Sequence, residues 1–171
     1  MAVADQHRWP LPIPDRPVTT SSYGLAPWPG DTPPPPWESV IEKIVAARSY
    51  WVSSTRPDGT PHVMPVWALW LDEALYFSSD PRSRKGRNLS ANPGVVVHLE
   101  SGDDVVIVEG RVERVAGDRV PPGFGDAYER KYGFWVDITN SAYALYVVQP
   151  AVVFTWTESE FPTAAIRWRF P

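Results

Sequence analysis

The chain of 171 residues contains no cysteine. This absence excludes disulfides, thiolate metal ligands and cysteine nucleophiles, and it is typical of proteins in the reducing cytoplasm. The sequence also has no run approaching the roughly 18 uncharged apolar residues that a membrane helix needs. Residues 1–10 include Asp5, His7 and Arg8 but no apolar stretch of the kind found in secretory signals. We therefore expect a soluble, cytoplasmic protein with no membrane partner.

Positive charge and histidine are scarce as well. Sixteen lysines and arginines against 20 aspartates and glutamates give a net charge of −4, which argues against a general nucleic-acid binder. The three histidines, His7, His62 and His98, are scattered and make no recognisable metal site. The chain has no Walker A loop, no G-x-G-x-x-G fingerprint and no G-x-S-x-G serine context. These absences disfavour P-loop, Rossmann and serine-hydrolase chemistry.

Proline and tryptophan are instead abundant. Ten of the 20 prolines precede Trp37, and they predict an N-terminal arm over residues 1–36 that cannot form regular structure. Because this arm also carries apolar residues such as Trp9 and Ile13, we expect much of it to wrap over the body of the protein or over a partner subunit. The nine tryptophans suit a core, a dimer seam or a pocket for a planar ligand. Residues 37–171 are long enough for one domain.

Hydrophobic periodicity predicts a mainly β domain. A helix is expected at 37–48, and a hairpin turns at Pro57-Asp58-Gly59. The second strand of the hairpin is apolar on both faces, which predicts burial on both sides with Pro65 at a bulge or an unpaired position. Strands are expected at 50–56, 60–71, 74–79, 95–100, 104–115, 144–157 (with a break at Pro150) and 164–170, and short helices at 82–91 and 123–132. Short, regularly spaced strands of this kind favour a closed or nearly closed antiparallel barrel.

The segment Ser78–Asn88 carries the clearest chemical signal. Two serine hydroxyls at a strand end are followed by four cations within six residues, at the start of a short helix. Hydroxyls, free N–H groups of a first helical turn, arginine forks and a lysine all suit a phosphate. The alternative is a solvated basic helix face. In an acidic protein this concentration of positive charge favours an anionic partner, and the segment predicts a phosphate-binding site.

The order of these motifs resembles that of a known family. The string Tyr50–Trp67 resembles the opening hairpin of the pyridoxamine 5′-phosphate oxidase-like, flavin- or deazaflavin-dependent oxidoreductases. Leu75–Ser79, Ser83–Leu89 and Val106–Val112 follow in the same order as the family's strand, phosphate loop with helix, and later strand with a glutamate-glycine pair. The resemblance covers residues 37–115 well and residues 128–170 loosely, and it leaves out the proline arm. It implies a split β-barrel homodimer with two cofactor sites at the subunit seam.

The resemblance also implies roles for particular residues. Ser79, Arg84 and Lys85 would hold the cofactor phosphate, with Ser78, Arg82 and Asn88 nearby. The backbone of Met64, Pro65, Val66 and Trp67 would run beside the tricyclic ring. Arg167 and Trp168 in the terminal strand would reach the cofactor of the partner subunit. The expected cofactor is coenzyme F420 or FMN, and F420 is favoured because its acidic oligoglutamate tail suits the clustered cations.

Several functions stay open at this point. The first is an oxidoreductase that transfers a hydride between the cofactor and an unsaturated small molecule, acting on CH–CH bonds. The alternatives are a non-catalytic flavin- or haem-binding protein, a pyridoxamine 5′-phosphate oxidase-like FMN oxidase, and a cofactor-free barrel used for interaction. Vitamin B6 oxidation is disfavoured because the extra C-terminal residues of the true oxidases have no match here. Sources of a proton are His62, Tyr128, Tyr132 and solvent, and a structural role is the alternative for His62.

Overall fold

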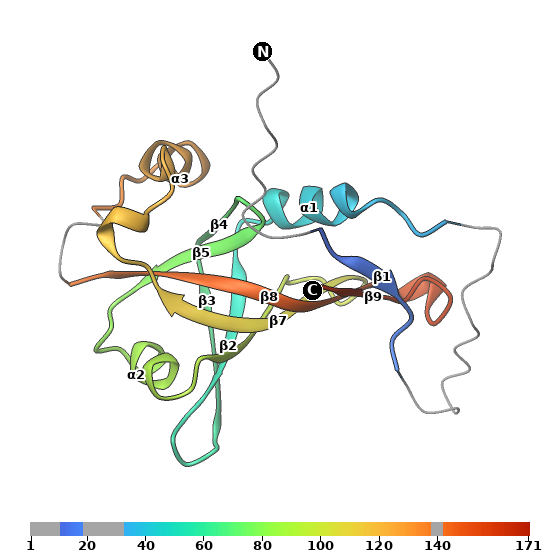
Figure 1. Cartoon of the computed structure of the whole chain (residues 1–171), viewed down its shortest axis with the longest axis horizontal. Coiled ribbons are helices and arrows are strands. Elements are labelled where there is room, and N and C mark those ends of the chain that lie inside the picture. Colours follow the sequence, from blue (N-terminus) through green and yellow to red (C-terminus); the bar gives the residue numbers. More distant parts are fainter. Residues whose placement is uncertain (1–10, 19–32, 138–141) are drawn as a thin grey trace.

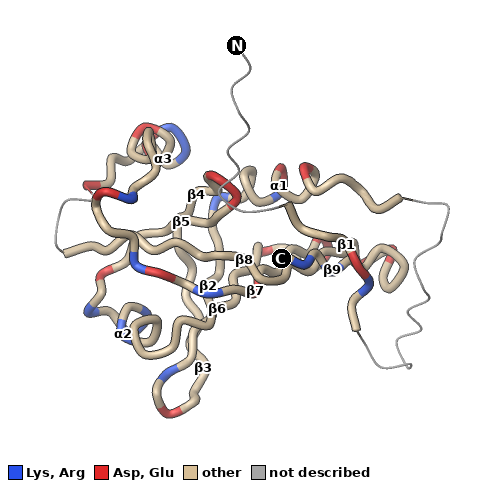
Figure 2. The backbone as a smooth tube through the Cα atoms, in the orientation of Figure 1, with Lys and Arg blue, Asp and Glu red and all other residues tan. Residues whose placement is uncertain are grey.

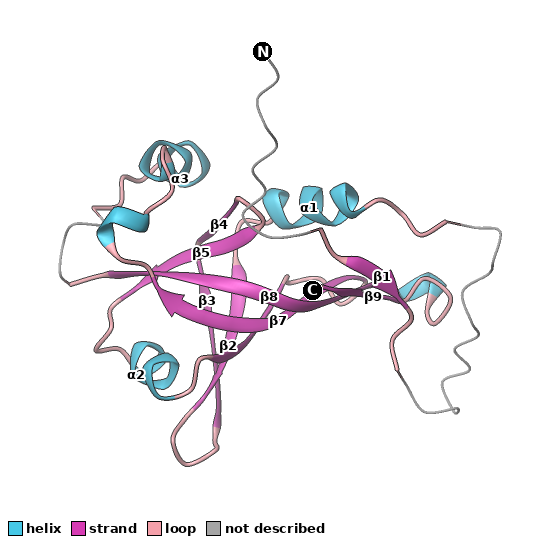
Figure 3. Ribbon diagram, viewed as in Figure 1, coloured by secondary structure: helices cyan, strands magenta, loops and turns pink. Residues whose placement is uncertain are grey.

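The computed structural model describes residues 11–18, 33–137 and 142–171, which form one curled antiparallel sheet with three α-helices around it (Figure 1, Figure 3). None of the helices formed by these residues has the length and apolar character needed to cross a membrane. The elements are β1 Ile13–Asp15, α1 Trp37–Ala46, β2 Tyr50–Thr55, β3 Pro61–Val66, β4 Ala68–Leu71, β5 Ala74–Ser79, α2 Arg84–Ala91, β6 Gly94–His98, β7 Asp104–Arg114, η2 Gly117–Arg119, α3 Phe124–Tyr132, β8 Ala144–Thr157, η3 Glu158–Glu160 and β9 Ile166–Arg169.

Strand β8 organises the sheet. The strand order is β1-β9-β8-β7-β6-β2-β3, with β4 and β5 reached from β8. One edge of β8 pairs with β7, while the other edge is shared by β5 and β9. The predicted break at Pro150 was wrong, because β8 runs through Pro150 without interruption. The register instead shifts in β7 at Gly110, where an added Cβ would lie 2.2 Å from the carbonyl oxygen of Gln149. The predicted mainly β, split-barrel fold is confirmed.

Two hydrophobic clusters lie on opposite faces of this sheet. The barrel interior contains Trp37, Trp70 and Trp168 together with inward residues such as Phe77. The other cluster packs under α3 and includes Tyr76 and its neighbours in β4 and β8. Because side chains alternate along a strand, Phe77 and Tyr76 serve different clusters. Helix α3 is therefore fixed to the outside of the barrel wall, next to the β3–β4 junction.

The expectation of one doubly buried strand over 60–71 was wrong. The chain forms two strands separated at Trp67, and among the described residues β3 has β2 as its one partner, at the edge of the sheet. Val63 and Met64 are 46% and 49% exposed. The physical reason is Pro65, which has no N–H to donate and so suits an edge strand. Val63 and Met64 of β3 therefore lie on the surface of this chain, whereas Val66 at the end of the strand is buried.

The expectation that the proline arm forms no regular structure was also wrong for three residues. Ile13–Asp15 pairs with β9, with Ile13 opposite Arg169 and Asp15 opposite Arg167. Proline at every second position keeps the backbone extended, while the N–H groups of the intervening residues remain available along one edge. Residues 1–10 and 19–32 of the predicted arm lie outside the described residues.

Candidate cofactor site

Helix α2 begins at a tight turn that follows β5. Ser83 caps the helix, since its Oγ accepts a hydrogen bond from the Gly86 N–H at 3.0 Å, and the Ser79 hydroxyl lies 3.4 Å from the Ser83 hydroxyl. A Cβ on Gly86 would lie 2.5 Å from the carbonyl oxygen of Pro81. Glycine at this position therefore lets the helix rest directly against its own turn. The result brings two serine hydroxyls to the N-terminal end of α2.

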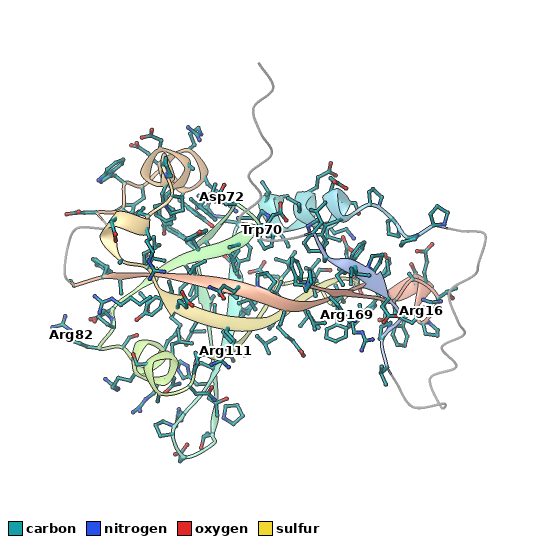
Figure 4. All side chains as sticks on the ribbon, in the orientation of Figure 1. Arg16, Trp70, Asp72, Arg82, Arg111 and Arg169 are labelled. Carbon is teal, nitrogen blue, oxygen red and sulfur yellow. The ribbon has the colours of Figure 1, made fainter. Side chains whose placement is uncertain are left out.

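The predicted cations of this segment separate into two groups. Arg84 and Arg87 are exposed, and Arg82 points away from the body of the chain (Figure 4). Arg82 pairs with Asp80 at 3.2 Å, and its side-chain hydrogen bond lowers the pKa of that carboxyl. Figure 2 shows the positive charges of α2 and its turn at one end of the barrel. Arg82 is thus already balanced by a carboxylate of its own turn.

Lys85 differs from these arginines because it is only 8% exposed. Its ammonium lies 5.5 Å from the centroid of the Phe77 ring, and no ion pair to it occurs in the described residues. Burial lowers the pKa of Lys85 to about 8. A buried cation with no counter-ion is costly, and an anion brought next to it would relieve that cost.

Asn88 lies one helical turn beyond Lys85 and is completely buried. Its Nδ2 donates to the Ser54 hydroxyl at 3.1 Å, but its Oδ1 has no partner among the described residues. His62 faces Ser54 across the β2–β3 ladder, and the buried Nδ1 of His62 is likewise unpartnered there. Buried polar atoms are normally hydrogen-bonded. The three unsatisfied groups near α2 therefore fit a ligand that brings both negative charge and hydroxyls.

The segment predicted to run beside the ring sits at the β3–β4 junction. Met64 and Trp67 are 49% and 40% exposed, whereas Val66 is buried. Trp67 stacks on Tyr132 with a centroid distance of 4.8 Å and an interplanar angle of 6°. The structure thus presents an exposed apolar edge here, with Trp67 held by α3.

Two tyrosines of α3 were predicted as sources of a proton. The Tyr132 hydroxyl donates to the Ala68 carbonyl at 2.7 Å and accepts from the Ala68 N–H at 2.9 Å, and burial raises its pKa to about 12. Burial also raises the pKa of Tyr128, a shift opposed by a hydrogen bond with Ser78. Both tyrosine hydroxyls are therefore already hydrogen-bonded within the chain. Of the three side chains predicted as proton sources, His62 is the one with an unpartnered nitrogen in the described residues.

The predicted residues of the terminal strand lie at the other end of β8. Trp168 is 2% exposed, its Nε1 donates to Thr155 at 2.9 Å, and its ring lies 5.3 Å from that of Trp37. The Trp168 ring is therefore part of the core of this chain, and a contact between Trp168 and a partner's cofactor stays a prediction. Arg167 pairs with Asp15 at 2.8 Å, and this hydrogen bond lowers the pKa of Asp15. A contact between Arg167 and a partner's cofactor stays a prediction.

Sequence reasoning missed two contributors to the site. Ser83 caps α2, and the Ser-x-x-Gly spacing before a cationic helix would have allowed that assignment. The Ser54 hydroxyl accepts a hydrogen bond from the Asn88 amide. No local sequence pattern predicts this contact, because it joins a helix to a strand more than 30 residues earlier. The i, i+3 spacing of Lys85 and Asn88 does place both on one helix face, which the structure buries.

Comparisons with known proteins agree with the fold of this chain. The family model described as pyridoxamine 5′-phosphate oxidase matches residues 38–157. A conserved hypothetical protein from Mycobacterium tuberculosis is 22% identical over 72% of this chain and 85% of that chain, with a TM-score of 0.61. An F420 reductase is 27% identical over 66% of this chain and 94% of that chain, with a TM-score of 0.51. A haem-binding protein from Mycobacterium smegmatis is 18% identical over 66% of this chain and 50% of that chain, with a TM-score of 0.51. No curated protein matches the sequence.

Proposed function

Because the chain belongs to the pyridoxamine 5′-phosphate oxidase family, we propose that it is an oxidoreductase that binds a flavin-type cofactor at α2. The cofactor phosphate would lie against Lys85 and the Ser79 hydroxyl. The observation that carries this proposal is the burial of Lys85 with no counter-ion in the described residues, beside an unpaired Oδ1 of Asn88. A bound phosphate would supply the missing charge, and cofactor hydroxyls would supply the missing hydrogen bonds.

We favour coenzyme F420 over FMN as that cofactor. Arg84 and Arg87 are exposed on α2. An FMN phosphate would engage the cations nearest to it, among them the predicted ligand Arg84, whereas the acidic tail of F420 would offer carboxylate partners to the exposed cations as well. The similarity to an F420 reductase supports the same choice.

The chain's own contribution to catalysis is position, charge and the exclusion of water. When bound, the cofactor supplies the hydride chemistry. The backbone of Met64–Trp67 would support its ring along an edge strand, and Trp67 is kept in place by its stack on Tyr132. His62 Nδ1 is the buried nitrogen near α2 on which a proton would be held, and solvent is the alternative source.

We also propose that two copies form the functional unit. Strand β3 is a sheet edge with exposed apolar side chains, of which Val63 is 46% and Met64 49% exposed. Unprotected apolar edges promote association, and soluble proteins usually cover them. A homodimer seam over β3 would bury these side chains and exclude water from the predicted ring position.

Cofactor titration of the purified protein tests the proposal. We expect binding of F420 and FMN with dissociation constants in the micromolar range or below, with F420 the tighter, and Lys85→Met should weaken both by about 100-fold. Lys43→Met is the matched control, because Lys43 is a partly exposed lysine of α1 that pairs with Asp104, and its substitution should leave cofactor binding unchanged.

Failure of both cofactors to bind, or equal binding by the Lys85→Met protein, would remove the phosphate assignment. Cofactor that binds but is never reoxidised by any acceptor would instead indicate a carrier.

A further inference from the structure

Four side chains from different elements meet at the β3–β4 junction. Trp67 stacks on Tyr132, and the Arg48 guanidinium lies 5.7 Å from the Trp67 ring and 5.9 Å from the Tyr132 ring. The Lys131 ammonium lies 5.5 Å from the Tyr132 ring. We call Arg48, Trp67, Lys131 and Tyr132 the aromatic-cation platform. It shares only Trp67 with the residues assigned above to the cofactor.

The platform carries two positive charges, those of Arg48 and Lys131. Neither Arg48 nor Lys131 takes part in an ion pair within the described residues. Lys131 donates instead to the Tyr50 hydroxyl at 2.7 Å and to the Ala68 carbonyl at 3.3 Å. Both acceptors are neutral. The local charge is therefore available to an anion from outside the chain.

The platform is also rigid and partly open. Both hydrogen bonds between the Tyr132 hydroxyl and Ala68 fix the ring of Tyr132, and Trp67 lies flat against it. Trp67 remains 40% exposed and Arg48 is exposed. A fixed indole with one face covered by tyrosine presents its remaining surface to a second planar group. Cations at the rim of such a surface favour an anionic one.

We propose that the aromatic-cation platform binds a planar, conjugated carboxylate, and that this molecule is the partner of the cofactor in hydride transfer. This assignment rests on the proposed function, since it places the molecule next to the segment Met64–Trp67 that would support the ring. In that reaction the C=C bond conjugated to the carboxylate becomes a C–C single bond. It gains a hydride at its β-carbon and a proton at its α-carbon, and the reduced flavin-type cofactor loses one hydride and one proton.

Binding of trans-cinnamate to the full chain, measured by calorimetry, tests the proposal. The neutral isostere trans-cinnamamide has the same shape and conjugation without the charge. We expect cinnamate to bind about tenfold more tightly than cinnamamide, and Arg48→Met to remove most of that difference. Arg130→Met is the matched control, because Arg130 is an exposed arginine on α3 that is not part of the platform. Circular dichroism would verify that each variant is folded.

The outcomes separate this inference from the proposed function. Equal binding of cinnamate and cinnamamide, or cinnamate binding unchanged by Arg48→Met, would overturn it. Competition between cinnamate and FMN would overturn the assignment to the hydride partner, whereas simultaneous binding would support it. If cofactor binding proves independent of Lys85 while cinnamate still depends on Arg48, the cofactor assignment fails and the platform stands as a site for planar anions.

Discussion

The two ends of strand β8 carry similar residues in opposite physical situations. At the β9 end, Arg167 pairs with Asp15, and Trp168 donates to Thr155 inside the core. At the α2 end, Lys85 is buried with no counter-ion in the described residues, and Asn88 Oδ1 lacks a partner there. Basic and aromatic residues alone therefore do not identify a binding region. A buried cation without a counter-ion distinguishes the α2 end, because such a charge persists in a fold only at a cost. An unpartnered buried atom alone does not, since Arg167 Nε at the β9 end also lacks a hydrogen-bond partner in the described residues.

The largest effect on stability is expected from Trp168→Ala at the β9 end. Removing a fully buried indole should lower the free energy of unfolding by about 3–5 kcal/mol, measured by denaturant titration. Trp135→Ala is the control, because Trp135 is 56% exposed and should matter far less. The folded fraction of the Trp168→Ala protein should bind cofactor as the parent does. Normal stability with lost binding would reverse the comparison and restore Trp168 as a ligand-contacting residue.

A smaller effect on stability is expected from the titration of Lys85 at the α2 end. Burial lowers its pKa to about 8, below the ordinary value of 10.5. The native state therefore binds fewer protons than the unfolded chain between these values, so stability of the cofactor-free protein should rise as pH increases from about 8 to about 10.5. Lys131, whose pKa is also lowered to about 8 by burial, contributes in the same direction.

The Lys85→Met variant separates the contribution of Lys85 to this pH dependence from that of Lys131. The variant should melt about 3 °C above the parent at pH 7, where the buried charge is fully present, and its stability should rise less steeply above pH 8. Thermal melts across this pH range, with Lys43→Met as control, provide the measurement. A lower melting temperature for Lys85→Met would show that the ammonium is stabilised inside the chain, which would remove the reason to look for an anionic ligand.

Local signals in the sequence account for much of the fold around the site. The Asp-Gly turn predicted the β2–β3 hairpin, where Gly59 adopts φ +85° and the Arg56 N–H bonds the Thr60 carbonyl. The start of α1 after Pro36 and the bounds of β5 were also predicted correctly. The exposure of β3 was not, because whether an apolar strand is central or at an edge depends on which strands pair with it.

The same distinction applies to the candidate site. Clustered cations predicted the location of α2 but not that only Lys85 among them would be buried. The separation depends on Asp80 balancing Arg82 and on Gly86 letting the helix approach its turn. Trp168 was assigned to a ligand because its strand resembles one that contacts a cofactor. Its neighbours Trp37 and Thr155 belong to other elements, α1 and β8, so the sequence around Trp168 gave no sign that it would be buried.

The smallest effect is expected from Arg167→Met, and it decides whether the β9 end contributes to binding at all. Arg167 already has an acidic partner in Asp15, so its loss should leave cofactor affinity within about twofold of the parent. Arg84→Met removes an exposed charge at the α2 end and should weaken F420 binding several-fold, more at low salt than at high salt. Calorimetric titrations at two ionic strengths would compare these variants. A large loss of affinity for Arg167→Met alone would mean that Arg167 leaves Asp15 to reach the cofactor of a partner subunit, and that an ion pair within one chain does not exclude a residue from a site formed by two.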